Sequence, residues 1–227
     1  MHKIKIHSLL RFHGVCTLVA LAWFALAVCA PATGRADTIA DSMADWAPDG
    51  EQGVNGWTYG YYNRTDDGNN SYAANEFILF ESAHWRGTGW RLVASNCPWT
   101  NITSEGVHPN GTNSCPLEEH WPIRRWTSDR AGTLEVTWHT REVNLAGAGV
   151  SGRLYHNGEL IDSEVIAGGD GAGVTRTLDV TVAVGDVIDL ANTPVGPNSN
   201  RSDGSDGSAN RLTIEDGVDD PDGDGLN

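Results

Sequence analysis

The sequence predicts an all-β domain, an antiparallel β-sandwich, behind a removable N-terminal leader. Three observations predict it. No segment shows an apolar helical period beyond one turn, whereas short alternating runs recur along the chain. The 227 residues include 27 glycines and 9 prolines, which indicates many turns. About eight to ten strands joined by short turns in one domain are typical of a β-sandwich.

The first 36 residues have the pattern of a secretory signal peptide. Basic residues at Lys3, Lys5 and Arg11 precede the apolar run Val15–Ala30, and small residues follow it. The run is shorter than the roughly 20 apolar residues that a membrane-spanning helix needs. We therefore expect cleavage after Ala36 and a protein that works outside the cytoplasm, secreted or in the cell envelope, with no membrane anchor.

The acidic balance of the chain excludes several partners. The net charge is −15, and it becomes −19 without residues 1–36, because the leader holds four basic residues and no acidic one. Such a surface repels nucleic acid and anionic lipid. A carbohydrate, a calcium ion or a cationic surface is a better partner, although solubility alone explains most of the charge.

Two cysteines remain after the leader. Cys97 and Cys115 form an isolated pair in an oxidising compartment, which predicts one disulfide. It would close a loop of roughly 20 residues and stabilise the domain by about 3 kcal/mol in the chain-entropy model. A metal site that adds His108 to the two thiols is the less favoured alternative.

The first half of the domain carries aromatic strands. Alternation in Trp57–Tyr62 places Trp57, Tyr59 and Tyr61 on one face and Tyr62 on the other. In the same way, a strand at 134–140 puts Leu134, Val136 and Trp138 on one face. Further strands in this half are expected at Phe77–Phe80, Arg91–Ala94 and Arg125–Thr127.

The second half is more regular. Asn157-Gly158 lies between the alternating runs Gly152–His156 and Leu160–Ile166, and this is the strongest short hairpin signal in the chain. More strands are expected at Thr175–Val184, Val187–Ala191 and Arg211–Glu215. A polar loop, 192–209, precedes the last of these. The predicted organisation is a leader at 1–36, a sandwich domain at 37–216 and an acidic tail at 217–227.

Three stretches carry a family resemblance. They are Gln52–Tyr62, Arg125–Ser128 before a strand beginning near Ala131, and Val182–Asp189 leading toward the final strand. This order resembles β-sandwich domains of secreted bacterial proteins, similar in pattern to jelly-roll carbohydrate-binding modules. The resemblance covers about Trp46 to Glu215. It implies a jelly-roll frame and carries no catalytic activity over to this chain.

The tail carries a separate resemblance. Asp220, Asp222 and Asp224 alternate before Gly225, which looks like the opening of a calcium loop of thrombospondin type 3 or EF-hand kind. Alternate aspartates present carboxylates to one centre. The sequence ends at Asn227, before the later ligands of such a loop, so we expect the motif to be completed only if repeats continue in a longer protein.

Aromatic side chains are the candidate ligand-binding residues. Trp85, Trp90, Trp99 and Trp121 lie in irregular sequence rich in glycine and proline, and Tyr62 lies on the opposite face from its aromatic neighbours. An exposed indole can stack on the apolar face of a pyranose ring. The alternative is core packing, because aromatic residues dominate sandwich interiors.

A second candidate is a structural calcium site in the loop before the last strand. Asp203, Asp206 and Asn210 bring three oxygen-bearing side chains together there, and Asp170 lies in a glycine-rich turn. The alternative is ordinary solvated turn chemistry.

No catalytic motif is evident. Five histidines remain after the leader, without zinc-site spacing, and Glu118 and Glu119 are adjacent acids expected to be solvated. The sequence therefore predicts a secreted, non-catalytic module that binds carbohydrate or another extracellular surface. The rivals are a polysaccharide-active lyase or hydrolase on a jelly-roll frame, and a structural or adhesive module of a larger envelope protein.

Overall fold

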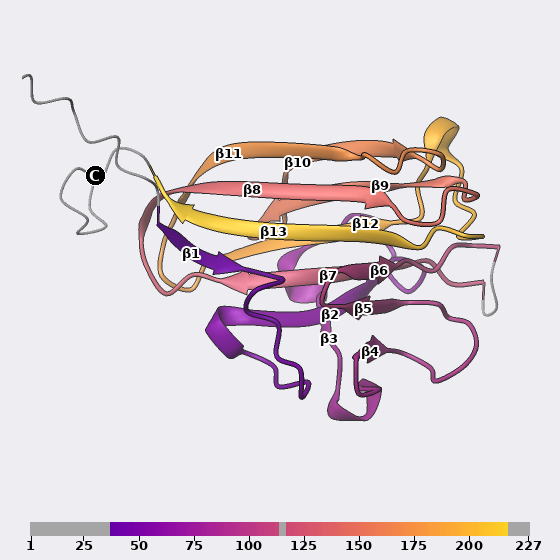
Figure 1. The fold of residues 1–227 in the computed structure, drawn as a ribbon, viewed down its shortest axis with the longest axis horizontal. Coiled ribbons are helices and arrows are strands. Elements are labelled where there is room, and N and C mark those ends of the chain that lie inside the picture. The colour runs from indigo at the N-terminus through magenta and orange to yellow at the C-terminus, as the bar shows by residue number, and fades with distance from the viewer. Residues whose placement is uncertain (1–36, 114–116, 218–227) are drawn as a thin grey trace, which may run out of the picture. The chain divides into compact units, whose positions relative to one another are not determined.

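Two antiparallel sheets pack face to face and enclose the core (Figure 1). The computed structural model describes residues 37–113 and 117–217. The predicted leader, the tail carboxylates Asp220, Asp222 and Asp224, and Cys115 of the predicted disulfide lie outside these ranges, so the leader, the tail motif and the disulfide remain predictions. The described residues contain no α-helix, and none of their helical turns is long and apolar enough to cross a membrane.

Sheet A has seven strands in the order β11-β8-β13-β6-β5-β4, and β1 also pairs with β13. Its strands are β1 (Thr38–Asp41), β4 (Gly89–Arg91), β5 (Asn101–Thr103), β6 (Gly106–His108), β8 (Gly132–Glu142), β11 (Val174–Val182) and β13 (Ser208–Asp216).

Sheet B has six strands in the order β10-β9-β12-β7-β2-β3. Its strands are β2 (Trp57–Asn63), β3 (Ile78–Leu79), β7 (His120–Thr127), β9 (Gly149–His156), β10 (Glu159–Ala167) and β12 (Val187–Thr193). Short 3-10 turns lie in the connections, at η1 (Val54–Gly56), η2 (Ala74–Glu76), η3 (Ser82–His84) and η4 (Pro197–Ser199).

The main core lies between the sheets and follows the predicted alternation. Leu134, Val136 and Trp138 of β8 are at most 3 % exposed and face inward, as predicted. Sheet B meets them with inward residues such as Ile188 and Leu190 of β12. Burying aliphatic and aromatic side chains from both sheets removes apolar area from water, and this holds the two layers together.

A second, smaller core covers the outer face of sheet B. Tyr62, Trp121 and Tyr155 lie on this face, and Tyr72 from the segment between β2 and β3 packs over them. Ring centroids of Tyr62 and Tyr72 are 5.3 Å apart, and those of Tyr72 and Tyr155 are 4.9 Å apart, in edge-to-face contact. Both faces of β2 are therefore buried, although alternation alone left the Tyr62 face open.

The predicted hairpin is confirmed. β9 and β10 pair antiparallel across Asn157 and Gly158, which have φ values of 51° and 85°. Positive φ at both central residues matches the right-handed twist of the flanking strands. Asn and Gly are the residues that adopt this conformation at low cost.

The described residues form thirteen strands, more than the expected eight to ten. The three strands that the sequence did not signal are β1, β5 and β6, which are only three or four residues long. Strands of this length hold too few alternating positions for a recognisable pattern. β7 starts at His120, five residues before its predicted start at Arg125.

Candidate functional site

A hollow of about 430 Å³ lies on the outer side of sheet A. It is bounded by β5, β6, the start of β13 and the end of β8. Small residues, Gly106, Gly207 and Ala209, form part of its lining. Ala209 pairs with Gly106 on one side and with Arg141 on the other, so these positions lie in one row across the sheet. Small side chains in the middle of the row leave space between the longer side chains around them.

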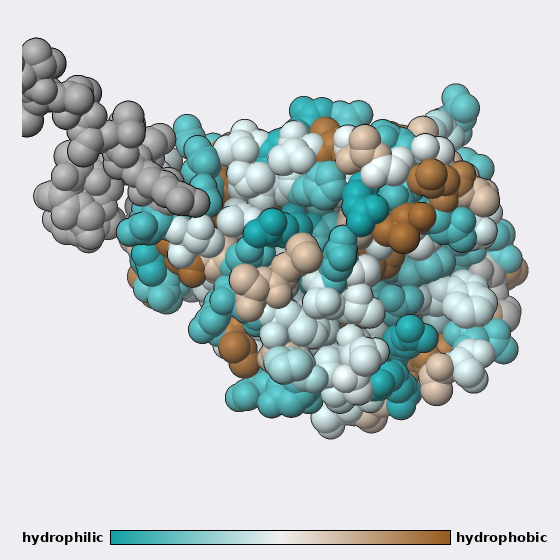
Figure 2. Space-filling view, viewed as in Figure 1, coloured by the Kyte–Doolittle hydropathy of each residue, from teal (hydrophilic) through white to brown (hydrophobic). Residues whose placement is uncertain are grey.

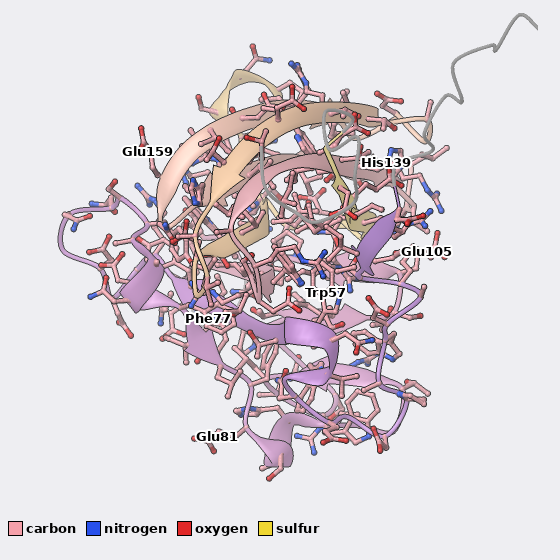
Figure 3. All side chains as sticks on the ribbon, turned by 90° about the vertical axis from the view of Figure 1, so that its left-hand side faces the viewer. Trp57, Phe77, Glu81, Glu105, His139 and Glu159 are labelled. Atoms are coloured by element: carbon pink, nitrogen blue, oxygen red, sulfur yellow. The ribbon has the colours of Figure 1, made fainter. Side chains whose placement is uncertain are left out.

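Polar groups surround this space. Asn101, Glu105, His108 and Arg141 line it. Arg141 Nη2 and Glu105 Oε1 are 2.9 Å apart and form an ion pair at its edge. Figure 3 shows Glu105 on the same side of the domain as His139 of β8, opposite Phe77 and Glu159 of sheet B. The outer face of sheet A therefore carries hydrogen-bonding groups around a depression, and the face of the molecule drawn in Figure 2 is mostly hydrophilic, with scattered hydrophobic residues.

His108 is a neutral member of this lining. Burial lowers the pKa of His108 below its usual value, outweighing the hydrogen bond to Pro109 and the charge of Asp203. Its Nδ1 lies 2.6 Å from the carbonyl oxygen of Pro109, so Nδ1 carries the proton and donates it there. Nε2 is then the acceptor nitrogen of the ring and can accept a hydrogen bond from a hydroxyl group.

Trp99 stands next to this hollow with nearly half of its surface open. It is 46 % exposed, and its ring centroid is 6.4 Å from that of His108. The Trp99 N–H donates to Asn110 Oδ1 at 2.8 Å, and Asn101 Nδ2 donates to the Trp99 carbonyl at 2.8 Å. These bonds fix the backbone that carries the indole. Trp99 thus remains available for the predicted ligand contact.

Three of the other predicted platform residues are core residues. Trp90 is 1 %, Trp121 2 % and Tyr62 1 % exposed, so none offers a ring face to a ligand. Trp90 packs inward from β4, while Trp121 and Tyr62 are paired neighbours on β7 and β2 under the segment that carries Tyr72. The expectation that these residues form a surface platform was wrong. Trp90 and Trp121 lie in strands longer or placed earlier than the sequence indicated, and the segment that carries Tyr72 covers Tyr62 and Trp121.

Trp85 is half-buried. Its ring centroid lies 5.1 Å from that of Trp90 and 6.0 Å from that of Trp46, and its side chain packs against the main core. A Cβ added to Gly50 would collide with its indole. Trp85 therefore contributes mainly to packing, with only part of its surface open.

The predicted calcium loop is arranged differently from expectation. Asp203 and Asp206 are at most 2 % exposed, so they are not solvated turn residues. Asp203 Oδ2 accepts from the Gly111 N–H at 2.8 Å. Asn210 lies on β13, and its Oδ1 accepts from Arg124 Nε at 2.6 Å. The Arg124 guanidinium therefore already engages the oxygen that Asn210 would offer to a cation, and calcium binding by these three residues stays a prediction.

Across residues 37–113 and 117–217, no three His, Cys, Asp or Glu side chains gather closely enough to hold a metal ion by themselves. Any cation site within this part of the chain must therefore also use amide, hydroxyl or backbone oxygens.

Glu119 is a structural anion and not a solvated acid. It is fully buried, and Arg201 Nη1 lies 2.6 Å from its Oε1, with Arg64 Nη1 3.3 Å from its Oε2. Trp121 Nε1 also donates to it at 2.8 Å. Its charge is satisfied by these partners, which ties β7 to the loop before β13.

A second hollow, of about 300 Å³, lies near β1 and the end of β7. Trp126 lines it but is only 2 % exposed. Its cation, Arg130, is engaged by Asp129 at 3.0 Å and by Asp216 at 3.4 Å. This hollow has a buried tryptophan and paired charges in its lining, whereas the larger hollow has the half-exposed indole of Trp99 beside its lining residue His108.

Sequence reasoning named Trp99 as one of five aromatic candidates and did not name the hollow-lining residues around it as ligand contacts. Asn101 and His108 lie on β5 and β6, whose three-residue lengths gave no strand pattern. The position of Arg141 could have been predicted, since extending the alternation of β8 beyond Thr140 places Arg141 on the outer face of the strand with His139. The role of the small residues Gly106 and Ala209 in forming the hollow becomes visible only when β6 and β13 pair.

No family model matches this chain, and no curated protein matches it. Among solved structures, it is similar to a family 35 carbohydrate-binding module from Clostridium thermocellum, with a TM-score of 0.28 and 12 % identity over 41 % of this chain and 69 % of that one. It is also similar to the CBM51 module from Clostridium perfringens GH95, solved with methyl-galactose, with a TM-score of 0.31 and 12 % identity over 53 % and 77 %.

A third similar structure is the C-terminal CBM6 of a marine laminarinase from Zobellia galactanivorans, with a TM-score of 0.29 and 10 % identity over 54 % of this chain and 85 % of that one. Each of these is a partial likeness of low identity. The β-sandwich of this chain follows from its own two sheets, and its function has to be argued from its own surface.

Proposed function

We propose that this chain is a secreted, non-catalytic module that binds a carbohydrate in the hollow beside Trp99. The observation that carries the proposal is the pairing of an indole 46 % exposed with a polar depression of about 430 Å³. A sugar ring presents an apolar face of C–H groups and a rim of hydroxyl groups. An open aromatic ring suits the first, and convergent hydrogen-bonding groups suit the second.

The hollow supplies both donors and acceptors for hydroxyl groups. Arg141 and Asn101 carry N–H donors, while His108 Nε2 and the carboxylate of Glu105 accept. Arg141 and Glu105 balance each other's charge in an ion pair. Both side chains are partly exposed, so a neutral ligand can reach them. The strongly acidic protein repels anionic polysaccharide. A neutral glycan is therefore the ligand class that we favour.

The rival enzyme reading requires at least two carboxylates that converge on the ligand, about 5 to 10 Å apart. Among the described residues that line the hollow, Glu105 is the one carboxylate, and it is ion-paired. The other acids with strongly raised pKa values, Glu142 and Asp206, are fully buried and cannot reach a polymer.

A glycan array with the purified protein tests this proposal. We expect retention on one class of neutral glycan and no release of reducing sugar or unsaturated product when the retained polysaccharide is incubated with the protein. Absence of retention on every glycan would refute carbohydrate binding. Product release that is lost in Glu105→Gln would instead establish the enzyme reading.

A further inference from the structure

The interior of the sandwich becomes polar toward one end. Along β8 the inward residues change from Trp138 to Thr140 and Glu142. β13 lies beside them with Asn210 paired to Thr140 and Ser208 paired to Glu142. All four polar residues are at most 3 % exposed. A run of polar side chains on the inner face of a sandwich is costly unless each finds a partner.

Sheet B adds another polar residue from the opposite side. Asn192 of β12 pairs with Gly152 of β9. A Cβ on Gly152 would lie 2.7 Å from Thr140 Oγ1 and 2.6 Å from the Trp138 ring, so Gly152 faces these residues across the interior. Paired residues on antiparallel strands project to the same face of the sheet. The amide of Asn192 therefore points into the space next to Thr140.

Two buried carboxylates meet at the end of this space. Asp206 Oδ1 accepts from the backbone N–H groups of Ala148 and Gly149 at 2.8 and 3.2 Å. The Ser208 hydroxyl lies 3.4 Å from Glu142 Oε2 and 3.0 Å from the Asp206 carbonyl, which keeps the two acids close together. Burial, followed by the charge of Asp206, raises the pKa of Glu142 to about 8, and burial raises the pKa of Asp206 to about 6.

Several polar atoms in this space have no hydrogen-bond partner within the described part of the chain. Unpartnered atoms on the four residues that offer an oxygen are Thr140 Oγ1, Glu142 Oε1, Asp206 Oδ2, and both Oδ1 and Nδ2 of Asn192, and Asn210 adds the donor Nδ2. The four residues that offer an oxygen are fully buried. Buried polar atoms are nearly always bonded in folded proteins, so a cluster of unsatisfied oxygens marks a place where a further group would bond.

We propose that these four residues, which we call the inner oxygen site (Thr140, Glu142, Asn192 and Asp206), bind a calcium ion. Two carboxylates, an amide oxygen and a hydroxyl oxygen supply four hard ligands, and water molecules complete the six to eight that Ca²⁺ takes. The cation would balance the mutual repulsion of the two acids. Only oxygen ligands are offered, without the thiolate or imidazole groups typical of zinc sites.

Arg124 is a buried cation that projects inward from β7. Its Nε donates to Asn210 Oδ1 at 2.6 Å and its Nη2 donates to the Thr103 carbonyl at 2.8 Å, while its Nη1 has no hydrogen-bond partner among the described residues. These bonds direct Arg124 to Asn210, the ladder partner of Thr140, and to β5, and neither goes to one of the four site residues. The site keeps Asp206 from the loop that the sequence predicted, and exchanges Asp203 and Asn210 for Glu142, Thr140 and Asn192.

Terbium luminescence and thermal melting of the purified protein test the proposal without any glycan. Tb³⁺ replaces Ca²⁺ at oxygen sites and emits when a nearby indole is excited, and Trp138 adjoins the site. We expect sensitised emission that Ca²⁺ quenches by competition, and a melting temperature that rises on going from chelator to millimolar Ca²⁺, because the folded state alone binds the ion.

Matched variants locate the ion. We expect Glu142→Gln and Asp206→Asn each to weaken Ca²⁺ binding at least tenfold, while Asp203→Asn and Glu159→Gln leave it unchanged. Glu159 is exposed at the start of β10, lies on the opposite side of the domain from His139 in Figure 3, and serves as the control for loss of one negative charge. Should the two site variants fail to fold, Trp138→Phe must still bind Ca²⁺ but lose most of the sensitised emission.

Three results would overturn the proposal. The first is a wild-type protein with no terbium emission and the same melting curve in chelator and in Ca²⁺. The second is unchanged Ca²⁺ affinity in Glu142→Gln. The third is a loss of affinity in Asp203→Asn greater than in Asp206→Asn, which would place the ion in the loop before β13.

Discussion

Replacing Trp121 by alanine removes the centre of the outer core on sheet B. The indole is 2 % exposed, its ring centroid lies 5.0 Å from that of Tyr62, and the guanidinium of Arg153 lies 4.8 Å from the ring centroid. Its Nε1 donates to Glu119 at 2.8 Å. We expect Trp121→Ala to destabilise the domain strongly, although the sequence offered Trp121 as a ligand contact with core packing as the alternative.

The magnitude follows from the cavity and the lost hydrogen bond. Truncating a buried tryptophan to alanine costs about 3–5 kcal/mol. Losing the bond to a charged acceptor adds about 1 kcal/mol, below the roughly 1.5–3 kcal/mol usual for such bonds, because Glu119 keeps Arg64 and Arg201 as partners. The total of about 4–6 kcal/mol is a large part of the roughly 5–15 kcal/mol that stabilises a typical domain.

Equilibrium urea unfolding of the wild type, Trp121→Ala and Trp99→Ala measures this difference. Trp99 serves as the matched control because the same indole is removed from a site that is 46 % exposed, where we expect a loss below about 1 kcal/mol. A loss below about 2 kcal/mol for Trp121→Ala at unchanged m-value would refute the burial of this residue, and equal losses in the two variants would refute the distinction between them.

Three further perturbations have expected outcomes. In chelator, raising the pH from 6.5 to 8 should lower the free energy of unfolding by up to about 1.4 kcal/mol per pH unit. The reason is that the pKa of Glu142 is raised to about 8 in the native state, which therefore holds a proton that the unfolded state has already released. Urea unfolding measured at several pH values should show a flatter slope in Glu142→Gln. Arg125→Met removes the cation whose Nε lies 2.7 Å from Asp189 Oδ1 and leaves this fully buried carboxylate with the Tyr72 hydroxyl but no counter-charge. It should cost about 3–5 kcal/mol in urea unfolding, whereas a cost below about 1 kcal/mol would show that the ion pair is unimportant. Gly158→Ala should lower the free energy of unfolding by more than about 1 kcal/mol, because the residue has φ 85° and its added Cβ would lie 2.5 Å from the Ala74 nitrogen; an unchanged melting curve would contradict the turn geometry.

The long strands and the hairpin could be predicted because their patterns are local. Alternation over Leu134–Thr140 and the Asn157-Gly158 turn each specify a conformation within about ten residues. Burial on the outer face of sheet B could not be predicted, because the segment that carries Tyr72 follows β2 directly but packs against residues of β7 and β9, which lie far away in the sequence. The same reasoning explains why Tyr62 was placed on the surface.

The candidate sites also combine features that local sequence predicts with features that depend on strands far apart in the sequence. The exposure of Trp99 agrees with its irregular sequence, but the hollow beside it is built by pairing β6 with β13, which are about a hundred positions apart in the sequence. Of the inner oxygen site, only the two residues on β8 could have been predicted from the sequence. Continuing the inward alternation of β8 from Trp138 leads to Thr140 and Glu142, two polar residues on a core face, and this conflict with the hydrophobic pattern is a signal for a site.

Isothermal titration of the best-retained neutral glycan tests the central claim most directly. The comparison uses the wild type, Trp99→Ala and Val184→Ala, because Val184 is 69 % exposed and lies outside the hollow lining, in the β11–β12 turn. The account predicts at least a tenfold loss of affinity for Trp99→Ala, wild-type affinity for Val184→Ala, and nearly unchanged melting temperatures for both. Wild-type affinity in Trp99→Ala would contradict the account.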